Sequence, residues 1–242
     1  MISVLVPTHR RPQLAKRMLD SILEMTSESV EVFFYVDEDD PTIEEYRELL
    51  GEEGVYHFHP DALVASHSWI SGSSKKVGEI WNVLAKESSG SWIMMGNDDL
   101  VFRTPGWDVK IEEALKGHFP KNLGVAYVND GGPKADTQCA FPIVSREWYT
   151  LLGYFTPERF HFLWNDTWIR DVASMAGCLH YIPDVLVEHC HFSFGKAERD
   201  VTYMKHRTGE AIAKRKEDEE VYQNTKHLRE LDADTVMKTL AL

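Results

Sequence analysis

The sequence has few cysteines and no long hydrophobic stretch. Cys139, Cys178 and Cys190 lie far apart and form no Cys-x-x-Cys pair, so neither a disulfide framework nor a cysteine zinc site is expected. No window approaches the roughly 20 apolar residues that span a bilayer. The apolar run at residues 2–6 is too short for a signal peptide, and its positive charges follow it rather than precede it. We therefore expect a soluble, cytoplasmic protein in a reducing compartment.

Positive charge and the common catalytic motifs are also scarce. The net charge is −13, which argues against an extended nucleic-acid surface because phosphate backbones are bound by clustered Lys and Arg. Any phosphate group of a ligand must therefore be bound by individual residues at one place rather than by an extended basic surface. No Gly-x-Ser-x-Gly, His-Glu-x-x-His, P-loop or Gly-x-Gly-x-x-Gly occurs, which argues against the common hydrolase, zincin, nucleotide-triphosphatase and dinucleotide-binding classes.

The chain is long enough, at 242 residues and 43% hydrophobic content, for one α/β domain with a small appendage. In the first hundred residues, strand-like runs alternate with amphipathic helices. A helix is expected over residues 14–25, another with Asp40 as its cap and Pro41 at its first position, and a third around residues 77–85. Residues 59–74 have the composition of a polar loop. The strand-like runs are 2–6, 30–36, 55–58 and the run before Gly96, and this alternation predicts a mostly parallel sheet.

In the second half of the chain, the predicted strands and helices no longer alternate regularly. Helices are expected at residues 146–152 and 165–176, the latter ended by Gly177. From Ala197 onward the chain is densely charged and weakly periodic, which predicts two solvated helices that act as an acceptor lid or as a homodimer contact. The chain thus divides into residues 1–100, 101–195 and 196–242. Strand character is found at residues 124–129, 141–144, 179–183 and 186–192.

Carboxylates stand where two of the predicted strands end. Asn97-Asp98-Asp99 follows a buried apolar run, and Asp37 follows residues 30–36. Open α/β sheets bind ligands at the carboxyl ends of their strands. Adjacent carboxylates repel each other unless a cation, a basic side chain or water compensates them, and we interpret the pair as a site for a divalent metal. A simple polar turn is the alternative interpretation of Asn97-Asp98-Asp99.

A metal needs further ligands, and histidines are the candidates. His189 and His191 lie two apart in a strand-like run, so they point to the same face. Paired histidines also occur as an ordinary half-buried polar face. Ligation by carboxylate and imidazole suits Mn²⁺ better than Ca²⁺, and Mg²⁺ remains an alternative.

Further polar residues have both a chemical and a structural interpretation. Asp166 lies three residues before Ile169, in line with the buried face of its helix, where it can act as a general base or as an ordinary helix-start acid. Arg10, Arg11 and Lys75 are candidates to meet phosphate or to neutralise Asp37, although such charges are usually solvated. Four tryptophans can stack on a sugar, but core filling is expected for most of them: Trp69, Trp107, Trp148 and Trp164.

The order of these segments resembles family 2 glycosyltransferases with the GT-A fold over about residues 1 to 195. The resemblance rests on Ile-Ser-Val-Leu-Val-Pro-Thr-His-Arg-Arg-Pro, the strand ending in Asp37, residues 75–82, and Ser-Trp-Ile-Met-Met-Gly-Asn-Asp-Asp. The segments that form the acceptor side in this family then follow in the same order: Phe-Pro-Ile-Val-Ser, Leu-Gly-Tyr-Phe, Trp-Asn-Asp and Val-Glu-His. The implied fold is a mostly parallel sheet flanked by helices, with a helical C-terminal tail.

The resemblance implies a role for particular residues. The family's Asp-x-Asp motif matches Asn97-Asp98-Asp99, so Asp99 is the implied metal ligand, and His189 matches the family's late metal-ligating histidine. Asn97 replaces the first acid, and an amide adds no charge for the metal. Asp166 matches the catalytic acidic residue. The implied nucleotide-sugar-binding residues are Pro7, Thr8, Arg10, Asp37, Lys75, Asn82, Asn97 and Asp98.

The implied reaction is transfer of a sugar from a UDP- or GDP-linked donor to an acceptor hydroxyl, with Mn²⁺ or Mg²⁺ as cofactor. Removal of the hydroxyl proton by Asp166 and direct displacement would invert the anomeric centre. A catalytically idle nucleotide-sugar-binding protein is one alternative, since Asn97 replaces an acid. A nucleotidyltransferase is another, although residues 7–12 contain no glycine for the phosphate loop of that class.

Overall fold

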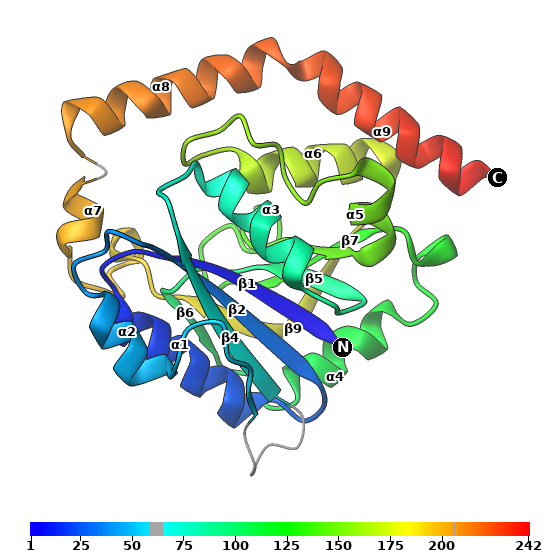
Figure 1. Cartoon of the computed structure of the whole chain (residues 1–242). Coiled ribbons are helices and arrows are strands. Elements are labelled where there is room, and N and C mark those ends of the chain that lie inside the picture. The colour runs from blue at the N-terminus through cyan, green and yellow to red at the C-terminus, as the bar shows by residue number, and fades with distance from the viewer. Residues whose placement is uncertain (59–64, 206) are drawn as a thin grey trace.

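A computed structural model describes residues 1–58, 65–205 and 207–242 (Figure 1). Within these residues nine strands form one sheet in the order β3-β4-β2-β1-β5-β8-β7-β9-β6. The central strands are β2 (Val30–Asp37), β1 (Ile2–Thr8) and β5 (Trp92–Met95), and all three are parallel. Their carboxyl ends therefore meet at one edge, as the alternation of strands and helices predicts.

The sequence interpretation misses one of the longest strands. β4 (Ala65–Gly72) pairs in parallel with β2 along its whole length and antiparallel with the short β3 (His57–Phe58). The expected loop over residues 59–74 is therefore wrong for residues 65–72, and its first part, 59–64, lies outside the described residues. β3 itself confirms part of the strand expected at 55–58.

The second half contributes a mixed part of the sheet. β8 (Ile143–Ser145) runs antiparallel to β5 and β7 (Val125–Asn129), and β6 (Leu100–Phe102) runs antiparallel to β9 (Leu179–His189). β9 is a single strand where two runs were expected. Its register with β7 shifts after Ile182, where Pro183 has no N–H to donate to the ladder.

Helices cover both faces of the sheet (Figure 1). α1 (Pro12–Met25), α2 (Ile43–Leu50) and α4 (Trp107–Leu115) lie on one side, and α3 (Val77–Glu87), α5 (Arg146–Leu152) and α6 (Asn165–Ala176) lie on the other. The expected helices at 146–152 and 165–176 are confirmed, with Gly177 at φ 69° ending the latter. Short 3₁₀ turns occupy Pro120–Asn122 and Phe192–Phe194. Trp69, Trp107 and Trp148 are fully buried core residues.

One expected cap is wrong. α2 begins at Ile43 rather than at Pro41. Asp40 is buried before this helix and accepts hydrogen bonds from the backbone N–H and the hydroxyl of Thr42, at 2.8 and 2.7 Å. It also accepts from the backbone N–H of Arg10, so this carboxylate joins two loops at the sheet edge.

The charged tail forms three helices, where two solvated ones were expected. α7 (Val201–Lys205) packs beside the carboxyl edge of the sheet, α8 (Gly209–Asn224) lies over the loop before α6, and α9 (Lys226–Ala241) packs on α6 and α5 (Figure 1). Ala233 and Val236 of α9 are buried in the main core. Among the described residues, no helix combines the length and the apolar content that crossing a membrane requires.

Candidate functional site

A cleft of about 500 Å³ opens at the carboxyl edge of the sheet. Its floor comes from the residues that follow β1, β2 and β5, and its sides come from α3, the end of β9 and the tail helices α7 and α8. Gly96 allows the chain to leave β5 here, because a Cβ on it would lie 3.0 Å from the carbonyl oxygen of Leu5. Parallel strands thus bring distant polar side chains together at this edge.

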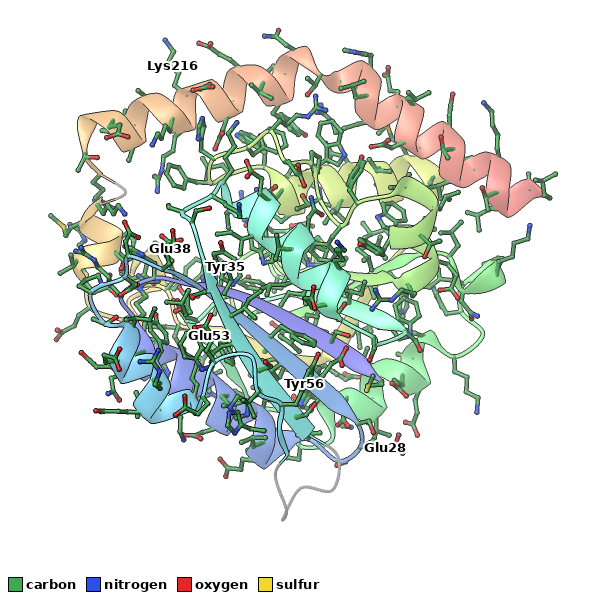
Figure 2. The ribbon with its side chains drawn as sticks, viewed as in Figure 1. Glu28, Tyr35, Glu38, Glu53, Tyr56 and Lys216 are labelled. Carbon is green, nitrogen blue, oxygen red and sulfur yellow. The ribbon has the colours of Figure 1, made fainter. Side chains whose placement is uncertain are left out.

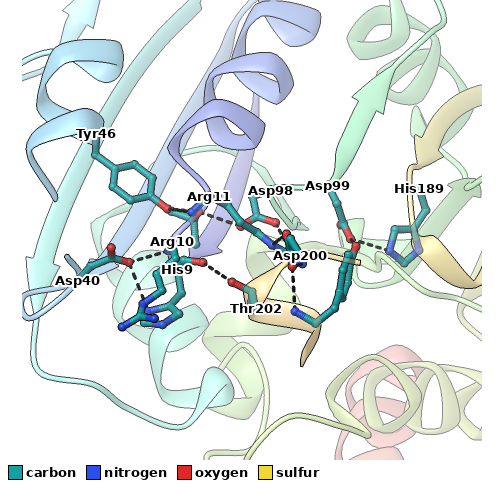
Figure 3. A network of polar contacts seen from close by, with 12 residues as sticks. His9, Arg10, Arg11, Asp40, Tyr46, Asp98, Asp99, His189, Asp200 and Thr202 are labelled. Atoms are coloured by element: carbon teal, nitrogen blue, oxygen red, sulfur yellow. Dashed lines mark hydrogen bonds and ion pairs between the residues drawn. The ribbon is translucent and has the colours of Figure 1, made fainter. Parts of the chain in front are cut away.

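Asp99 is the buried carboxylate at the centre of the cleft. Its Oδ2 accepts a hydrogen bond from the Tyr203 hydroxyl at 2.7 Å and lies 3.4 Å from His189 Nε2 (Figure 3). Its Oδ1 is buried and has no hydrogen-bond partner among the described residues. Burial works against ionisation, but His189 and Tyr203 outweigh it and hold the pKa of Asp99 below its ordinary value. Asp99 is therefore a carboxylate with one free oxygen.

Asp98 is held by the loop after β1. It accepts a hydrogen bond from the Thr8 hydroxyl at 2.8 Å and forms an ion pair with Arg11 at 3.1 Å. Burial raises the pKa of Asp98 above its ordinary value, while Arg11 opposes the rise and Asp99 adds to it. Asp98 is thus compensated within the protein, whereas Asp99 is only partly compensated.

The neighbouring strand tip carries a second polar cluster (Figure 3). His9 Nδ1 lies 3.3 Å from Oδ2 of Asp37 and 3.3 Å from Oδ2 of Asp40. The cation expected to neutralise Asp37 was Arg10, Arg11 or Lys75, but the partner is His9. Arg10 adopts a left-handed φ of 55°, and its side chain is exposed and does not line the cleft.

The tail closes this side of the cleft. Arg11 pairs with Asp200 at 2.7 Å and lies 4.1 Å from the ring centre of Tyr203, and the Thr202 hydroxyl donates to the carbonyl of His9 at 3.0 Å. Although burial works against its charge, Asp98 and Asp200 raise the pKa of Arg11 above its ordinary value. α7 is therefore joined to the loop after β1 through Thr202 and to Asp99 in the loop after β5 through Tyr203.

The donor set fits a divalent metal. Asp99 offers an unpartnered carboxylate oxygen, and His189 offers an imidazole beside it. The ring of His191 lies 5.1 Å from that of His189, and both histidines line the cleft, as the two-residue spacing predicts. Within the described parts of the chain, no three His, Cys, Asp or Glu side chains already form a complete metal-binding group. Two protein ligands leave positions open for oxygens of a bound molecule.

Most of the residues singled out by the sequence lie together at the cleft. Asn97 is half-buried, and Lys75 is an exposed residue just before α3. The lining contains Pro7, Thr8, Asp37, Lys75, Asn97, Asp98, Asp99 and His189. The other three, Arg10, Asn82 and Asp166, do not line it.

Asn82 has a structural explanation. Its carboxamide donates to the carbonyl of Thr156 at 2.8 Å and accepts from the backbone N–H of Phe155 at 2.8 Å. Four residues earlier, a Cβ on Gly78 would lie 2.5 Å from the carbonyl oxygen of Pro157. This face of α3 therefore packs directly on the loop before α6 rather than on the cleft.

Asp166 lies in the first turn of α6 and is half-buried. Burial raises its pKa, and the backbone and side-chain hydrogen bonds of Thr167 and the charge of Arg170 partly oppose the rise. Its charge acts on the buried thiol of Cys139, whose pKa is raised mainly by burial. The preceding Asn165 is buried, and its Nδ2 has no hydrogen-bond partner among the described residues.

Sequence reasoning missed the residues that the tail contributes. Tyr203 contacts Asp99 over a separation of 104 residues, and Asp200 contacts Arg11 over 189. Their segment has no apolar periodicity that ties it to a sheet edge. The only signal was the weak periodicity of the segment, which left a lid as one interpretation. Cys139, Cys178 and Cys190 are buried and free.

Sequence comparisons identify no relative. No protein-family model matches the chain, and no curated protein has significant sequence similarity to it.

Structural comparisons do find similar folds. The mannosyltransferase PcManGT from Pyrobaculum calidifontis, in complex with GDP-Man and Mn²⁺, superposes with a TM-score of 0.64 at 15% identity, over 99% of this chain and 72% of that one. S. aureus TarS 1–349 in complex with UDP-GlcNAc superposes with a TM-score of 0.59 at 15% identity, over 86% of this chain and 61% of that one. Glucosyl-3-phosphoglycerate synthase from Mycobacterium tuberculosis, in complex with Mn²⁺, UDP and phosphoglyceric acid, superposes with a TM-score of 0.53 at 13% identity. The match covers 88% of this chain and 76% of that one. The chain therefore has the GT-A fold of glycosyltransferases.

Proposed function

We propose that the chain is a metal-dependent glycosyltransferase that moves a sugar from a UDP- or GDP-linked donor to an acceptor hydroxyl. The observation that carries the proposal is the buried Oδ1 of Asp99, which has no partner among the described residues and lies beside His189 in the cleft. A buried carboxylate oxygen without a partner is costly unless a ligand compensates it. The GT-A fold at this sheet edge supports the same conclusion.

Asp99 and His189 would hold the metal, which is Mn²⁺ or Mg²⁺. Two of the structural neighbours were solved with Mn²⁺, one of them with GDP-Man and the other with UDP. When bound there, the cation would supply electrostatic stabilisation of the negative charge that develops on a leaving diphosphate. Asn97, the first residue of the Asn97-Asp98-Asp99 motif, would hydrogen-bond a ribose hydroxyl through its side-chain amide.

The N-terminal loops would bind the nucleotide. Pro7 and Thr8 line the cleft beside Asp98, and Asp37 stands at the tip of the next strand, where it can accept a hydrogen bond from the base or ribose. Lys75 would meet the diphosphate from the start of α3. Arg10 and Asn82 would contribute to nucleotide-sugar binding only indirectly, by fixing the loops that they contact.

Asp166 would remove the proton from the acceptor hydroxyl, and direct displacement would then invert the anomeric centre. Its raised pKa suits this role, because a general base works best when its pKa approaches the operating pH. The residue lies outside the cleft lining, so the acceptor would have to reach the start of α6.

A catalytically idle nucleotide-sugar-binding protein is the second candidate. Two observations favour it: Asn97 replaces an acid, and Asp166 does not line the cleft. Such a protein would bind the donor together with the metal, but it would release no nucleoside diphosphate, whichever acceptor is added.

Isothermal titration calorimetry with UDP and GDP, each with and without Mn²⁺, tests the proposal. At least one nucleotide is expected to bind, and to bind at least tenfold more tightly with Mn²⁺. The same titration with Asp99→Asn is expected to lose the metal dependence. If neither nucleotide binds the wild-type protein in the presence of Mn²⁺, the glycosyltransferase assignment is wrong.

A further inference from the structure

The cleft has two walls of opposite charge. The wall at the strand ends carries the carboxylates of Asp37, Asp98 and Asp99, and Arg11 on the same wall pairs with Asp98. The wall formed by α7, residues 207–208 and α8, which we call the tail wall, carries four cations: Lys205, Arg207, Lys214 and Arg215. Its only carboxylate among the described lining residues is Glu210. A local excess of cations stands out in a chain whose net charge is −13.

Most of these cations are not used in internal ion pairs. Lys214 pairs with Glu210 at 2.7 Å. Lys205, by contrast, lies 3.3 Å from His9 Nε2, and the Arg207 guanidinium lies 4.9 Å from the ring centre of Phe192. Within the described residues, neither these two nor Arg215 has a carboxylate within 4.0 Å. They remain available to an anion.

The tail wall is fixed in place rather than loosely attached. Asp218 of α8 is completely buried and accepts hydrogen bonds from the backbone N–H groups of His161, Phe162 and Leu163, at 2.6, 2.8 and 2.9 Å. This contact sets the rotation of α8 about its axis. Lys214 and Arg215 then line the cleft, whereas Lys216 points away from the body of the protein (Figure 2).

The donor alone would not compensate these charges. A nucleoside diphosphate sugar carries about one negative charge on each of its two phosphates, and one divalent cation balances both. Asp99 would hold that cation on the opposite wall, and Lys75, which lines the cleft just before α3, is already proposed to meet the same diphosphate. The tail wall thus faces a metal-bound donor that brings little negative charge of its own.

We propose that the tail wall binds an anionic group of the acceptor, so that the acceptor is a phosphate- or carboxylate-bearing compound with a free hydroxyl. This inference rests on the proposed glycosyltransferase function. Arg207 and Arg215 are its specificity-determining residues, because guanidinium groups bind phosphate and carboxylate oxygens in a bidentate manner. Neither residue is assigned to the donor.

The test uses Arg207→Ala/Arg215→Ala, with Lys216→Ala as the matched control. Both changed arginines are exposed, so the double variant is expected to fold, which its thermal unfolding checks. With Mn²⁺ present, GDP and UDP are titrated into each protein. The affinity for the nucleotide is expected to stay within about twofold of wild type in both variants.

The acceptor side is probed with glycerol 3-phosphate, glycerate and glycerol, titrated with and without nucleotide. The anionic probes are expected to bind the wild-type protein, with the stronger one identifying phosphate or carboxylate, and to bind the double variant about five- to tenfold more weakly. Lys216→Ala is expected to match wild type, and glycerol is expected not to bind.

Three results would overturn the inference. Equal binding of the anionic probes to the wild type and the double variant would remove the tail wall as their site. A tenfold loss of nucleotide affinity in the double variant would reassign the wall to the donor's diphosphate. Binding of glycerol 3-phosphate without any binding of GDP or UDP would leave an anion site but contradict both its role for an acceptor and the proposed function.

Discussion

Tyr203 shows how one side chain of the tail stabilises the central carboxylate. Its hydroxyl donates to Asp99 at 2.7 Å in a buried position, and a hydrogen bond to a charged group contributes about 1.5 to 3 kcal/mol. Burial and the adjacent charge of Asp99 raise the pKa of Tyr203, so the hydroxyl remains a donor at neutral pH. Asp99 is therefore held in one orientation before any ligand arrives.

Replacing Tyr203 with Phe is expected to lower the free energy of unfolding by about 1.5 to 3 kcal/mol, because Asp99 would lose its donor. Denaturant unfolding measures the change. Tyr149→Phe is the matched control, since within the described residues its hydroxyl makes no hydrogen bond, and it is expected to change stability by less than about 0.5 kcal/mol. Equal effects of the two variants would show that the contact with Asp99 contributes nothing.

Asp166 is the residue on which turnover is expected to depend. Replacing it with Asn removes the proposed base and keeps the shape, so kcat is expected to fall at least about 100-fold while the affinity for nucleotide changes by less than about twofold. Asp184→Asn, an exposed carboxylate of β9, is the control. Unchanged turnover in Asp166→Asn would exclude it as the base.

The residues of the site differ in how readily the sequence predicts them. Asp37, Asp98 and Asp99 follow strands with clear apolar runs, and the parallel sheet then brings them together. Arg11 replaces Arg10 in the cleft because Arg10 adopts a left-handed φ of 55° that turns its side chain outward. No local pattern reveals a conformation of this kind in an arginine.

At the scale of elements, α8 is held by one buried carboxylate. Asp218 accepts three backbone hydrogen bonds from the loop before α6. Asp218→Ala would leave three N–H groups without their acceptor, and we expect a loss of about 2 to 4 kcal/mol together with faster proteolysis within α8.

Glu219→Gln is the control for this change, because Glu219 is the next residue of α8 and is exposed. Its cleavage pattern and unfolding are expected to match the wild type. If Asp218→Ala resists protease as well as this control does, the contact does not anchor α8.

β4 shows why part of the fold escapes prediction. Its sequence, Ala-Ser-His-Ser-Trp-Ile-Ser-Gly, is rich in residues of low strand propensity. It nevertheless forms a strand because β2 offers it eight consecutive partners, from Val30 to Asp37. Such pairing is a property of the assembled sheet. The helices at Arg146–Leu152 and Asn165–Ala176, by contrast, have local signals at their ends and match the expectation.

At the scale of the whole molecule, the tail belongs to the site rather than to a separate appendage. Arg11, in the loop after β1, pairs with Asp200, which lies just before α7. Burial works against the charge of Asp200, but the hydrogen bond and charge of Arg11 and the backbone N–H of Tyr203 hold its pKa below the ordinary 3.8. A homodimer through the tail remains a prediction.

The docking of α7 is therefore expected to depend on pH. A carboxylate whose folded-state pKa is lowered contributes stability above its ordinary pKa and loses it as the pH falls through the lowered value. Hydrogen exchange in α7 is thus expected to accelerate below about pH 4. Asp200→Asn should exchange faster than wild type at neutral pH and show a smaller acid step, because only the contact of Tyr203 with Asp99 then still depends on a carboxylate. An acid step identical to that of wild type would assign the effect to a group other than Asp200.

Anomalous diffraction from crystals grown with Mn²⁺ and either GDP or UDP tests the central claim most directly. Asp99 and His189 are predicted to hold the metal, so a manganese peak is expected within coordination distance of Asp99 Oδ1 and His189 Nε2, with the diphosphate oxygens completing its shell. A nucleotide bound in the cleft with no manganese at these two residues would contradict the account.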